Sequence, residues 1–273
     1  MPEGHIAHFK VLEQTPHLAG VPVGVSSPNR RFETGAAALD SATVRSLQAH
    51  GKHLFYNFDA RRVLHVHLGM NGSFAYHRGG SSGAANRSGR SHSGRSHSGA
   101  WLRVSSPSLT FDLRSPKVCE LVDAAGRDRI TAALGPDPIL VDEAPGGLGA
   151  IREMELPVGA VIVDQSVIAG IGNVYRAEIL YACSIHPDRQ ASTLSDDDLG
   201  NIWAGAVRML RAGVADGGRI RTVDRRRDFT VRDSRTCYVY GQRFCARCGS
   251  LIRRWMLAGQ FAYACEACQP LAV

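Results

Sequence analysis

Two closely spaced pairs of cysteines near the C-terminal end constrain this sequence more than any other feature. The segment "CARC" holds Cys245 and Cys248, and "CEAC", after sixteen intervening residues, holds Cys265 and Cys268. Two such pairs can place four thiolates tetrahedrally around one zinc ion and close the site to other ligands. The spacing therefore predicts one structural zinc ion in a short hairpin. Redox-active pairs and disulfides are the alternatives, and neither suits two pairs in one hairpin of a cytoplasmic chain.

The positive charge of the chain is concentrated in the same region. The 273 residues carry a formal net charge of +7, and the segment from Gly218 to Arg254 contains eleven arginines, three aspartates and no lysine or glutamate. Because guanidinium groups match phosphate oxygens, the stretch "RIRTVDRRRDFTVRDSR" predicts binding of a polyanion such as nucleic acid. An ordinary solvated basic face is the alternative.

Composition and hydropathy argue against a membrane protein. Hydrophobic residues make up 44% and charged residues 21% of the chain, as in an ordinary globular protein. The most apolar stretch, "PVGAVIVDQSVIAGIGNVY", has Asp164 and Gln165 near its middle and would span a bilayer poorly. No arginine-flanked apolar leader precedes the first polar residues. We therefore expect a cytoplasmic protein without a membrane partner.

The N-terminal half has the pattern of one helix followed by strands. "PEGHIAHFKVLEQ" predicts a short helix with Ile6, Phe9 and Leu12 along one side. Period-two segments then predict strands, in which His65 and His67 point outward. These strand segments are "KHLFYNF", "RVLHVHLGM", "WLRVSS" and "LTFDLRS". Several strands without long helices between them predict an antiparallel sandwich or barrel.

Three further segments organise the rest of the chain. Residues 78–99, rich in Ser, Gly, Arg and His, predict an inert loop, with a basic DNA-contacting arm or a weak metal-binding tract as alternatives. Prolines and glycines in residues 135–150 predict a linker, after which the apolar period becomes helical. Ser195 can cap a helix with three aspartates in its first turn.

The apolar face of this predicted helix contains Leu199, Ile202, Trp203, Ala206 and Leu210.

Residues 164–187, "DQSVIAGIGNVYRAEILYACSIHP", form a candidate anion site. A helix starting at Pro157, a glycine turn and a second helix starting at Asn173 would present bare backbone N–H groups to a phosphate. A helical hairpin without a ligand is the alternative.

The first residues carry a candidate nucleophile. Removal of Met1 would expose Pro2, whose secondary amine can attack an aldehyde carbon and form an iminium, and Glu3 could then move protons. Proline is common at this position, so an incidental Pro2 is the alternative.

The ordered set of motifs resembles one known family. The start Met-Pro-Glu-Gly, "HGKHLFYNF", "HLGMNGSF", "LGPDPIL", "DQSVIAGIGNVYRAEIL" and the cysteine hairpin occur in the order found in formamidopyrimidine-DNA glycosylase and endonuclease VIII. The resemblance spans nearly the whole chain. Gly4 favours the bacterial endonuclease VIII branch, whereas "HLGMNG" favours the formamidopyrimidine branch.

The resemblance implies a fold and a reaction. The fold is α+β with several domains: a β-sandwich with an N-terminal helix over residues 1–134, a linker over 135–150, a helix-two-turn-helix domain over 151–236 and a zinc finger over 237–273. The partner is damaged duplex DNA, for which a monomer suffices. The reaction is that of a DNA glycosylase with AP-lyase activity: Pro2 attacks C1′ of the damaged nucleotide, expels an oxidised base, expected to be a pyrimidine, and cleaves the strand by β and δ elimination.

The resemblance also assigns residues by position. Glu3 is the proton shuttle, and Lys52 meets the lesion phosphate and assists catalysis, with an exposed strand lysine as the alternative. His67 and Asn173 match phosphate contacts. Met70 matches the wedge that fills the space of the flipped nucleotide, with a core methionine as the alternative.

The sequence departs from the family pattern at several places. His5 and Ile6 replace a second proline and a glutamate, which removes a carboxylate near the sugar. Gln260 stands five residues before the third zinc cysteine, where the family usually has an arginine, so a phosphate contact there loses its charge. Arg114 matches only loosely an arginine that faces the opposite base.

Three alternatives stay open. A preference for 8-oxoguanine is one, and a lesion-binding protein of the same fold that has lost catalysis is another. The third is a generic zinc-ribbon protein with an incidental N-terminus.

Overall fold

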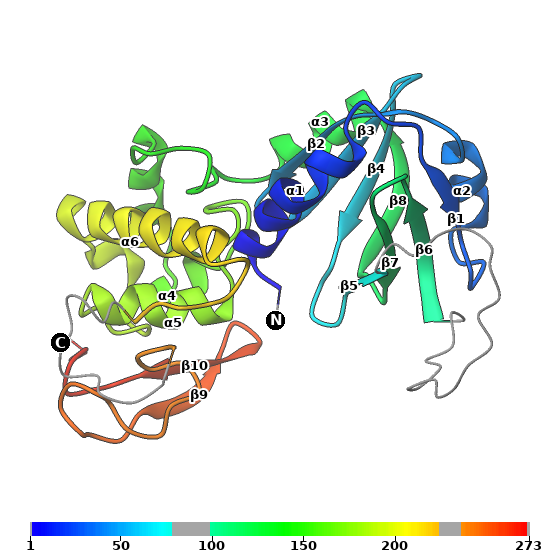
Figure 1. The fold of residues 1–273 in the computed structure, drawn as a ribbon. Coiled ribbons are helices and arrows are strands. Elements are labelled where there is room, and N and C mark those ends of the chain that lie inside the picture. Colours follow the sequence, from blue (N-terminus) through cyan, green and yellow to red (C-terminus); the bar gives the residue numbers. More distant parts are fainter. Residues whose placement is uncertain (1, 78–98, 224–235, 272–273) are drawn as a thin grey trace, which may run out of the picture. The chain divides into compact units, whose positions relative to one another are not determined.

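A computed structural model describes residues 2–77, 99–223 and 236–271 of the chain (Figure 1). The chain divides into two compact units. The first contains Met1–Pro2, Lys10–Ala49 and His53–Arg129, and the second contains Glu3–Phe9, His50–Lys52 and Ile130–Val273. The serine- and glycine-rich loop predicted at residues 78–99, except Gly99, lies outside the described residues, as does most of the arginine-rich stretch, residues 224–235.

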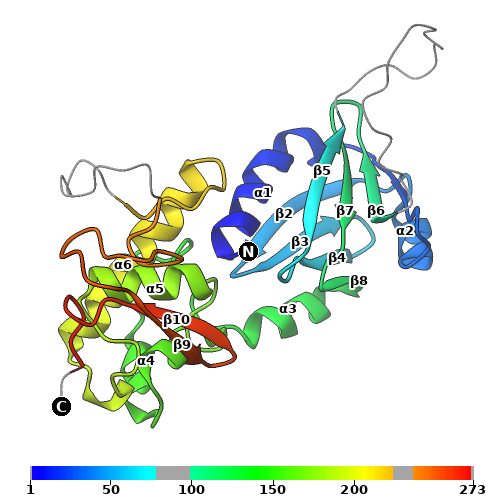
Figure 2. The same cartoon turned by 90° about the horizontal axis from the view of Figure 1, so that it is seen from below.

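The first unit is built on two four-stranded antiparallel sheets (Figures 1 and 2). One sheet has the order β1 (Gly24–Ser26), β6 (Ala100–Ser105), β7 (Thr110–Arg114) and β5 (Ser73–His77). The other has the order β2 (Val44–His50), β3 (His53–Phe58), β4 (Arg62–His67) and β8 (Val118–Asp123). The rings of Tyr56 in β3 and Phe111 in β7 lie 6.5 Å apart, so the apolar sides of the two sheets meet. The predicted strands and the α+β class are confirmed.

One detail of the predicted sheet is wrong. Leu64 and Val66 of β4 are buried as expected, but His65 on the opposite side is also buried, with 3% of its surface exposed. Its ring stacks on Phe55 at 5.0 Å, and its Nδ1 lies 2.8 Å from the Glu120 carboxylate. Alternation predicts the side to which a residue points, but not whether neighbouring strands cover that side.

The N-terminal helix is present as α1 (Gly4–Leu18), but its buried side differs from the prediction. Leu12 is 63% exposed, whereas His5, His8 and Gln14 are buried. The hydroxyl of Tyr56 donates to Gln14 Oε1 at 2.7 Å, and His8 Nε2 lies 2.7 Å from Asp137 Oδ2. These polar side chains are buried because each has a hydrogen-bond partner.

The second unit is helical and ends in a β-hairpin. Helix α5 (Asn173–Ala182) packs against both α6 (Asp196–Ala215) and the hairpin of β9 (Arg253–Leu257) and β10 (Gln260–Ala264), as Figure 1 shows. The remaining helices of the described residues are α2 (Glu33–Leu39) and α3 (Ala124–Ala132), α4 (Val158–Val161), and the 3-10 helices η2 (Gly146–Glu153) and η3 (Ala191–Thr193). None of the helices in the described ranges is both long and apolar enough to cross a lipid bilayer.

The predicted helix ends are partly confirmed. Ser195 caps α6, accepting from the N–H of Asp198 at 3.1 Å, and the predicted apolar face of α6 lies in the core. Helix α5 begins at Asn173 as expected. The helix expected from Pro157 onward has only four residues, because Asp164 accepts from the N–H of Ser166 at 2.9 Å and starts a turn.

Candidate functional site

The loop that precedes α5 brings three distant segments of the second unit together. The N–H of Gly4 donates to the carbonyl of Gly170 at 2.9 Å. The ammonium group of Lys52 donates to the carbonyl of Ile171 at 2.6 Å, and the amide of Gln165 donates to the same carbonyl at 2.9 Å. Lys52 is therefore held beside α5 and is not an exposed strand lysine.

The carboxylate of Glu3 binds the N-terminus of α5. Its Oε2 accepts from the backbone N–H of Gly172 at 2.9 Å and of Tyr175 at 3.4 Å, and its Oε1 accepts from Val174 at 2.8 Å. The sequence pattern predicts that these N–H groups are open to a phosphate, but in the structure they bind the chain's own carboxylate. The positive end of the helix dipole thus fixes the side chain that follows Pro2.

Two glycines make this close approach possible. A Cβ atom at Gly172 would lie 2.6 Å from the carboxyl carbon of Glu3, and a Cβ atom at Gly4 would lie 2.7 Å from the Cα of Gly170. Any larger residue at either position would push the N-terminal segment away from α5. Gly4 and Gly172 therefore allow the N-terminal segment and the loop before α5 to pack closely against each other.

Burial controls the protonation of Glu3. The side chain is 1% exposed, and this burial raises the pKa of Glu3, although the Lys52 charge and the three backbone N–H groups partly oppose the rise. A carboxyl group with a raised pKa keeps its proton closer to neutral pH, so it can donate a proton and then accept one.

Arg176 supports the site and was not indicated by the sequence pattern. Its buried guanidinium group donates to Oδ1 of Asn173 and, at 3.1 Å each, to the carbonyls of Leu257 and Phe261. It thereby connects Asn173 to the hairpin that carries Gln260. Burial lowers the pKa of Arg176 to about 10, so it stays charged at neutral pH. The only sequence signal is its i, i+3 spacing from Asn173 within α5.

Three of the predicted DNA-contacting residues belong to the first unit. His67 ends β4, and its Nδ1 accepts from the N–H of Gly69 at 3.1 Å. Met70 in the following turn is 69% exposed, so it is not a core methionine. Arg114 ends β7, with its Nη2 3.5 Å from Oδ2 of the buried Asp112. Contacts of these residues with DNA stay predictions.

His5, one of the departures from the family pattern, faces the interior of the second unit. Its Nε2 lies 3.2 Å from the carbonyl of Gly218, and its ring meets the ring of Tyr175 edge-on at 5.1 Å. It is 0% exposed, and burial lowers its pKa to about 4. His5 is therefore neutral at physiological pH.

Replacement of His5 by glutamine is expected to make the protein less sensitive to acid. Between pH 6.5 and 4 the unfolded chain binds a proton on His5 that the folded chain does not, so stability falls as the pH falls through this window. The loss attributable to His5 is about 2.5 kcal/mol at pH 4.5. Urea unfolding of the wild type and of His5→Gln at pH 7 and pH 4.5 measures this loss of stability, with His17→Gln as control. An unchanged pH dependence in His5→Gln would contradict this assignment.

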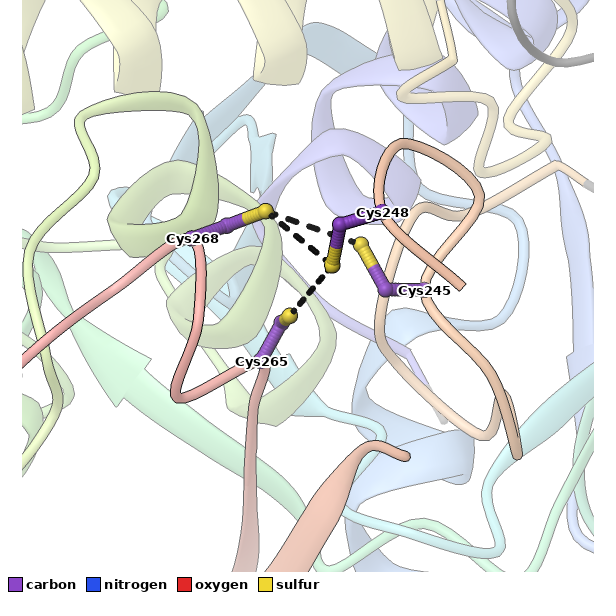
Figure 3. A group of neighbouring side chains, drawn as sticks. All are labelled: Cys245, Cys248, Cys265 and Cys268. Carbon is purple, nitrogen blue, oxygen red and sulfur yellow. Dashed lines mark hydrogen bonds between the residues drawn. The ribbon is translucent and has the colours of Figure 1, made fainter. Parts of the chain in front are cut away.

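The side chains of the four paired cysteines converge, as Figure 3 shows. Cys245 and Cys248 precede β9, and Cys265 and Cys268 follow β10. All four sulfurs lie within 4.8 Å of one another, with separations of 3.4 Å, 3.6 Å and 3.8 Å for three of the pairs. Sulfurs around a tetrahedral zinc ion are about 3.8 Å apart, so the residues fit such a group and could hold one metal ion.

Comparisons of sequence agree with the motifs. The family description "formamidopyrimidine-DNA glycosylase N-terminal domain" matches residues 1–119, and "formamidopyrimidine-DNA glycosylase H2TH domain" matches residues 134–224. The chain is 34% identical over 277 residues to endonuclease 8 1 of Mycobacterium tuberculosis, which covers 98% of this chain and 100% of the relative. It is 32% identical over 251 residues to formamidopyrimidine-DNA glycosylase of Thermomicrobium roseum, covering 83% and 81%.

Solved structures share the fold. The formamidopyrimidine-DNA glycosylase of Lactococcus lactis, solved with DNA containing an abasic site, superposes with a TM-score of 0.77 at 19% identity, covering 98% of this chain and 99% of that one. A complex of the same protein with DNA containing an oxidised pyrimidine gives a TM-score of 0.77, also at 19% identity, covering 98% and 100%. Fold, sequence matches and ordered motifs together show that the chain belongs to the formamidopyrimidine-DNA glycosylase and endonuclease VIII family.

Proposed function

We propose that the protein is a bifunctional DNA glycosylase and AP lyase that excises oxidised bases, pyrimidines in particular, from damaged duplex DNA. The observation that carries the proposal is the arrangement of Glu3, which follows Pro2 and is held by the N-terminus of α5 beside Lys52. A secondary amine next to a buried carboxyl group suits iminium chemistry. The Lactococcus lactis relative binds abasic-site and oxidised-pyrimidine DNA, which supports this substrate class.

The first step removes the damaged base and links Pro2 covalently to the sugar. After removal of Met1, the nitrogen of Pro2 bonds to C1′ and the glycosidic bond breaks, so the base leaves with the bonding electrons and takes a proton from Glu3. The C1′–O4′ bond then opens, O4′ receives the proton of the Pro2 nitrogen, and C1′ and nitrogen form an iminium. The raised pKa of Glu3 favours the protonated form that this step requires.

The following steps cleave the strand. The iminium acidifies C2′, and the Glu3 carboxylate removes a C2′ proton, so that the electron pair expels the 3′ phosphate in a β elimination. A second, δ elimination expels the 5′ phosphate. Lys52 holds the lesion phosphate and stabilises the charge that develops on it.

The other predicted residues act on the DNA. His67 and Asn173 bind phosphates, Met70 fills the space of the flipped nucleotide, and Arg114 faces the opposite base. Gln260 donates a hydrogen bond at the hairpin tip without adding charge, so it binds more weakly than the usual arginine.

The cysteine cluster holds one structural zinc ion in this proposal. Replacement of Cys265 by alanine is expected to remove the metal and unfold the hairpin, because structural zinc contributes about 10–16 kcal/mol in small zinc domains. Elemental analysis should find about one zinc per wild-type chain and far less in the variant. Cys119→Ala, in β8 of the first unit, is the matched control and should keep its zinc. Iron in the wild type, or no metal, would contradict the zinc assignment.

A lesion-binding protein without catalysis is the second candidate. It is favoured by the departures at His5, Ile6 and Gln260, because Ile6 stands in the place of a glutamate and Gln260 in the place of an arginine. Retention of Pro2, Glu3 and Lys52 favours the enzyme, since a binding protein has no use for a free secondary amine.

A lesion panel on duplex DNA tests the proposal. The wild type is incubated with duplexes that contain one abasic site, one oxidised pyrimidine or one 8-oxoguanine, with and without borohydride. We expect a covalent adduct with each cleaved duplex, fastest excision of the pyrimidine, and 3′ and 5′ phosphate ends at the gap. Tight binding with no adduct on all three duplexes would contradict the proposed enzyme and support the lesion-binding protein.

A further inference from the structure

The buried sulfurs of the cysteine cluster require hydrogen-bond donors. Cys245 and Cys265 are 2% and 0% exposed, whereas Cys248 is open to water. Four thiolates outweigh the charge of one divalent zinc ion, so a cluster that holds zinc is negatively charged. Negative charge on a buried sulfur is costly unless a donor faces the sulfur, because water does not reach it.

Tyr181, near the end of α5, faces Cys245. Its Oη lies 3.2 Å from the Sγ of Cys245, and Tyr181 is only 1% exposed. A tyrosine hydroxyl keeps its proton at neutral pH, while a cysteine that binds a metal has lost its proton. The hydroxyl of Tyr181 therefore donates this hydrogen bond, and the sulfur accepts it.

Two contacts hold the ring of Tyr181. The ring stacks on Tyr238 with the ring centres 5.3 Å apart, and the guanidinium carbon of Arg247 lies 5.1 Å from its centre. Both contacts involve the ring and not the hydroxyl, so they would persist with phenylalanine at this position.

Glu178, one turn earlier on α5, holds the segment that leads into the cluster. Its carboxylate accepts from the backbone N–H of Tyr238 at 2.7 Å, and from those of Val239 and Tyr240 at 2.9 Å each. Residues i and i+3 of a helix lie on the same side, so Glu178 and Tyr181 face this segment together. The position of Tyr181 is thus fixed by contacts outside the four cysteines.

We propose that Tyr181 is a positioning residue of the metal site, where its hydrogen bond to the Cys245 thiolate tightens metal binding. The hydrogen bond stabilises the deprotonated sulfur that a metal ion requires. The proposal rests on the proposed function in taking the cysteine cluster as a zinc site. It goes beyond that function in naming a residue that does not itself bind the metal.

Tyr181→Phe tests the proposal in the full chain, because it removes the hydroxyl and keeps the ring. Competition for zinc with a colorimetric chelator measures the affinity, and we expect the variant to bind zinc about tenfold more weakly than the wild type. Tyr263→Phe is the matched control and should keep the wild-type affinity. It removes the hydroxyl of another tyrosine that packs on the same apolar cluster.

Cobalt(II) in place of zinc gives a spectroscopic readout of the sulfur itself. A hydrogen bond lowers the energy of the sulfur lone pairs, so its loss should move the thiolate-to-cobalt charge-transfer band of Tyr181→Phe to longer wavelength. The band of Tyr263→Phe should stay in place. The d–d bands should keep the intensity of a tetrahedral site in all three proteins.

Three outcomes overturn the proposal. An unchanged zinc affinity or an unchanged charge-transfer band in Tyr181→Phe would show that the hydroxyl does not act on the sulfur. Loss of the tetrahedral d–d bands in this variant would show that Tyr181 only maintains the fold around the cluster. A wild type that binds neither metal would contradict the zinc assignment and this proposal with it. Borohydride trapping decides the proposed enzymatic activity separately, because it requires neither variant.

Discussion

A two-residue extension before Pro2 is expected to abolish the borohydride adduct with abasic-site DNA. The extension converts the secondary amine of Pro2 into an amide, which has no lone pair available for attack on C1′. DNA binding should persist, since the side chains proposed to contact phosphate are unchanged. Trapping followed by mass spectrometry of the N-terminal peptide measures the adduct.

Pro2→Gly refines this prediction. A primary amine can still form an imine, but glycine is flexible and does not hold its nitrogen in the attack geometry. We expect the trapping rate to fall about a hundredfold, in line with the cost of misplacing a reacting group. Adduct formation by the extended chain at the wild-type rate would place the nucleophile elsewhere, with Lys52 as the first residue to test.

Glu3→Gln is expected to separate base excision from formation of the trapped iminium. Excision of an oxidised base should slow by about 10²–10⁴, because the glutamine cannot protonate the leaving base. Trapping on a preformed abasic site should persist, because no base has to leave. Gel analysis of base excision and of borohydride trapping on matched duplexes measures both rates.

The pH dependence gives an independent check on Glu3. Because burial raises the pKa of Glu3, wild-type excision should decline as the pH rises through that raised value, and the variant should lack this decline. Glu155→Gln, exposed in the loop before α4, is the matched control and should behave as wild type. Equal slowing of excision and trapping in Glu3→Gln would instead indicate that Glu3 only holds the N-terminal segment on α5.

Much of the fold follows from local patterns in the sequence. The four strand segments, the Ser195 cap and the start of α5 at Asn173 depend on residues within one or two turns or strand repeats, so periodicity and capping rules identify them. The ordered motifs identified the family correctly, as the 34% identity to endonuclease 8 1 confirms.

The buried polar residues were the main failure of these rules. His65 was predicted to point outward, and no pattern predicted an interior position for His5 or His8, yet all three are buried. A histidine is buried when a partner is present, and the partners Gly218, Asp137 and Glu120 lie 55 or more residues away in the chain. Nothing in a local window records such a partner.

In the candidate site, too, the sequence determines some features and the tertiary structure decides others. The sequence by itself determined which groups are available: the amine of Pro2, the carboxyl of Glu3, the four cysteines and the glycine turn before Asn173. Only the tertiary structure decided that the anion at the N-terminus of α5 is Glu3, and that Arg176 connects Asn173 to the hairpin. The physical reason is that hydrogen bonds and desolvation act between atoms brought together by folding, while sequence patterns report only on neighbours along the chain.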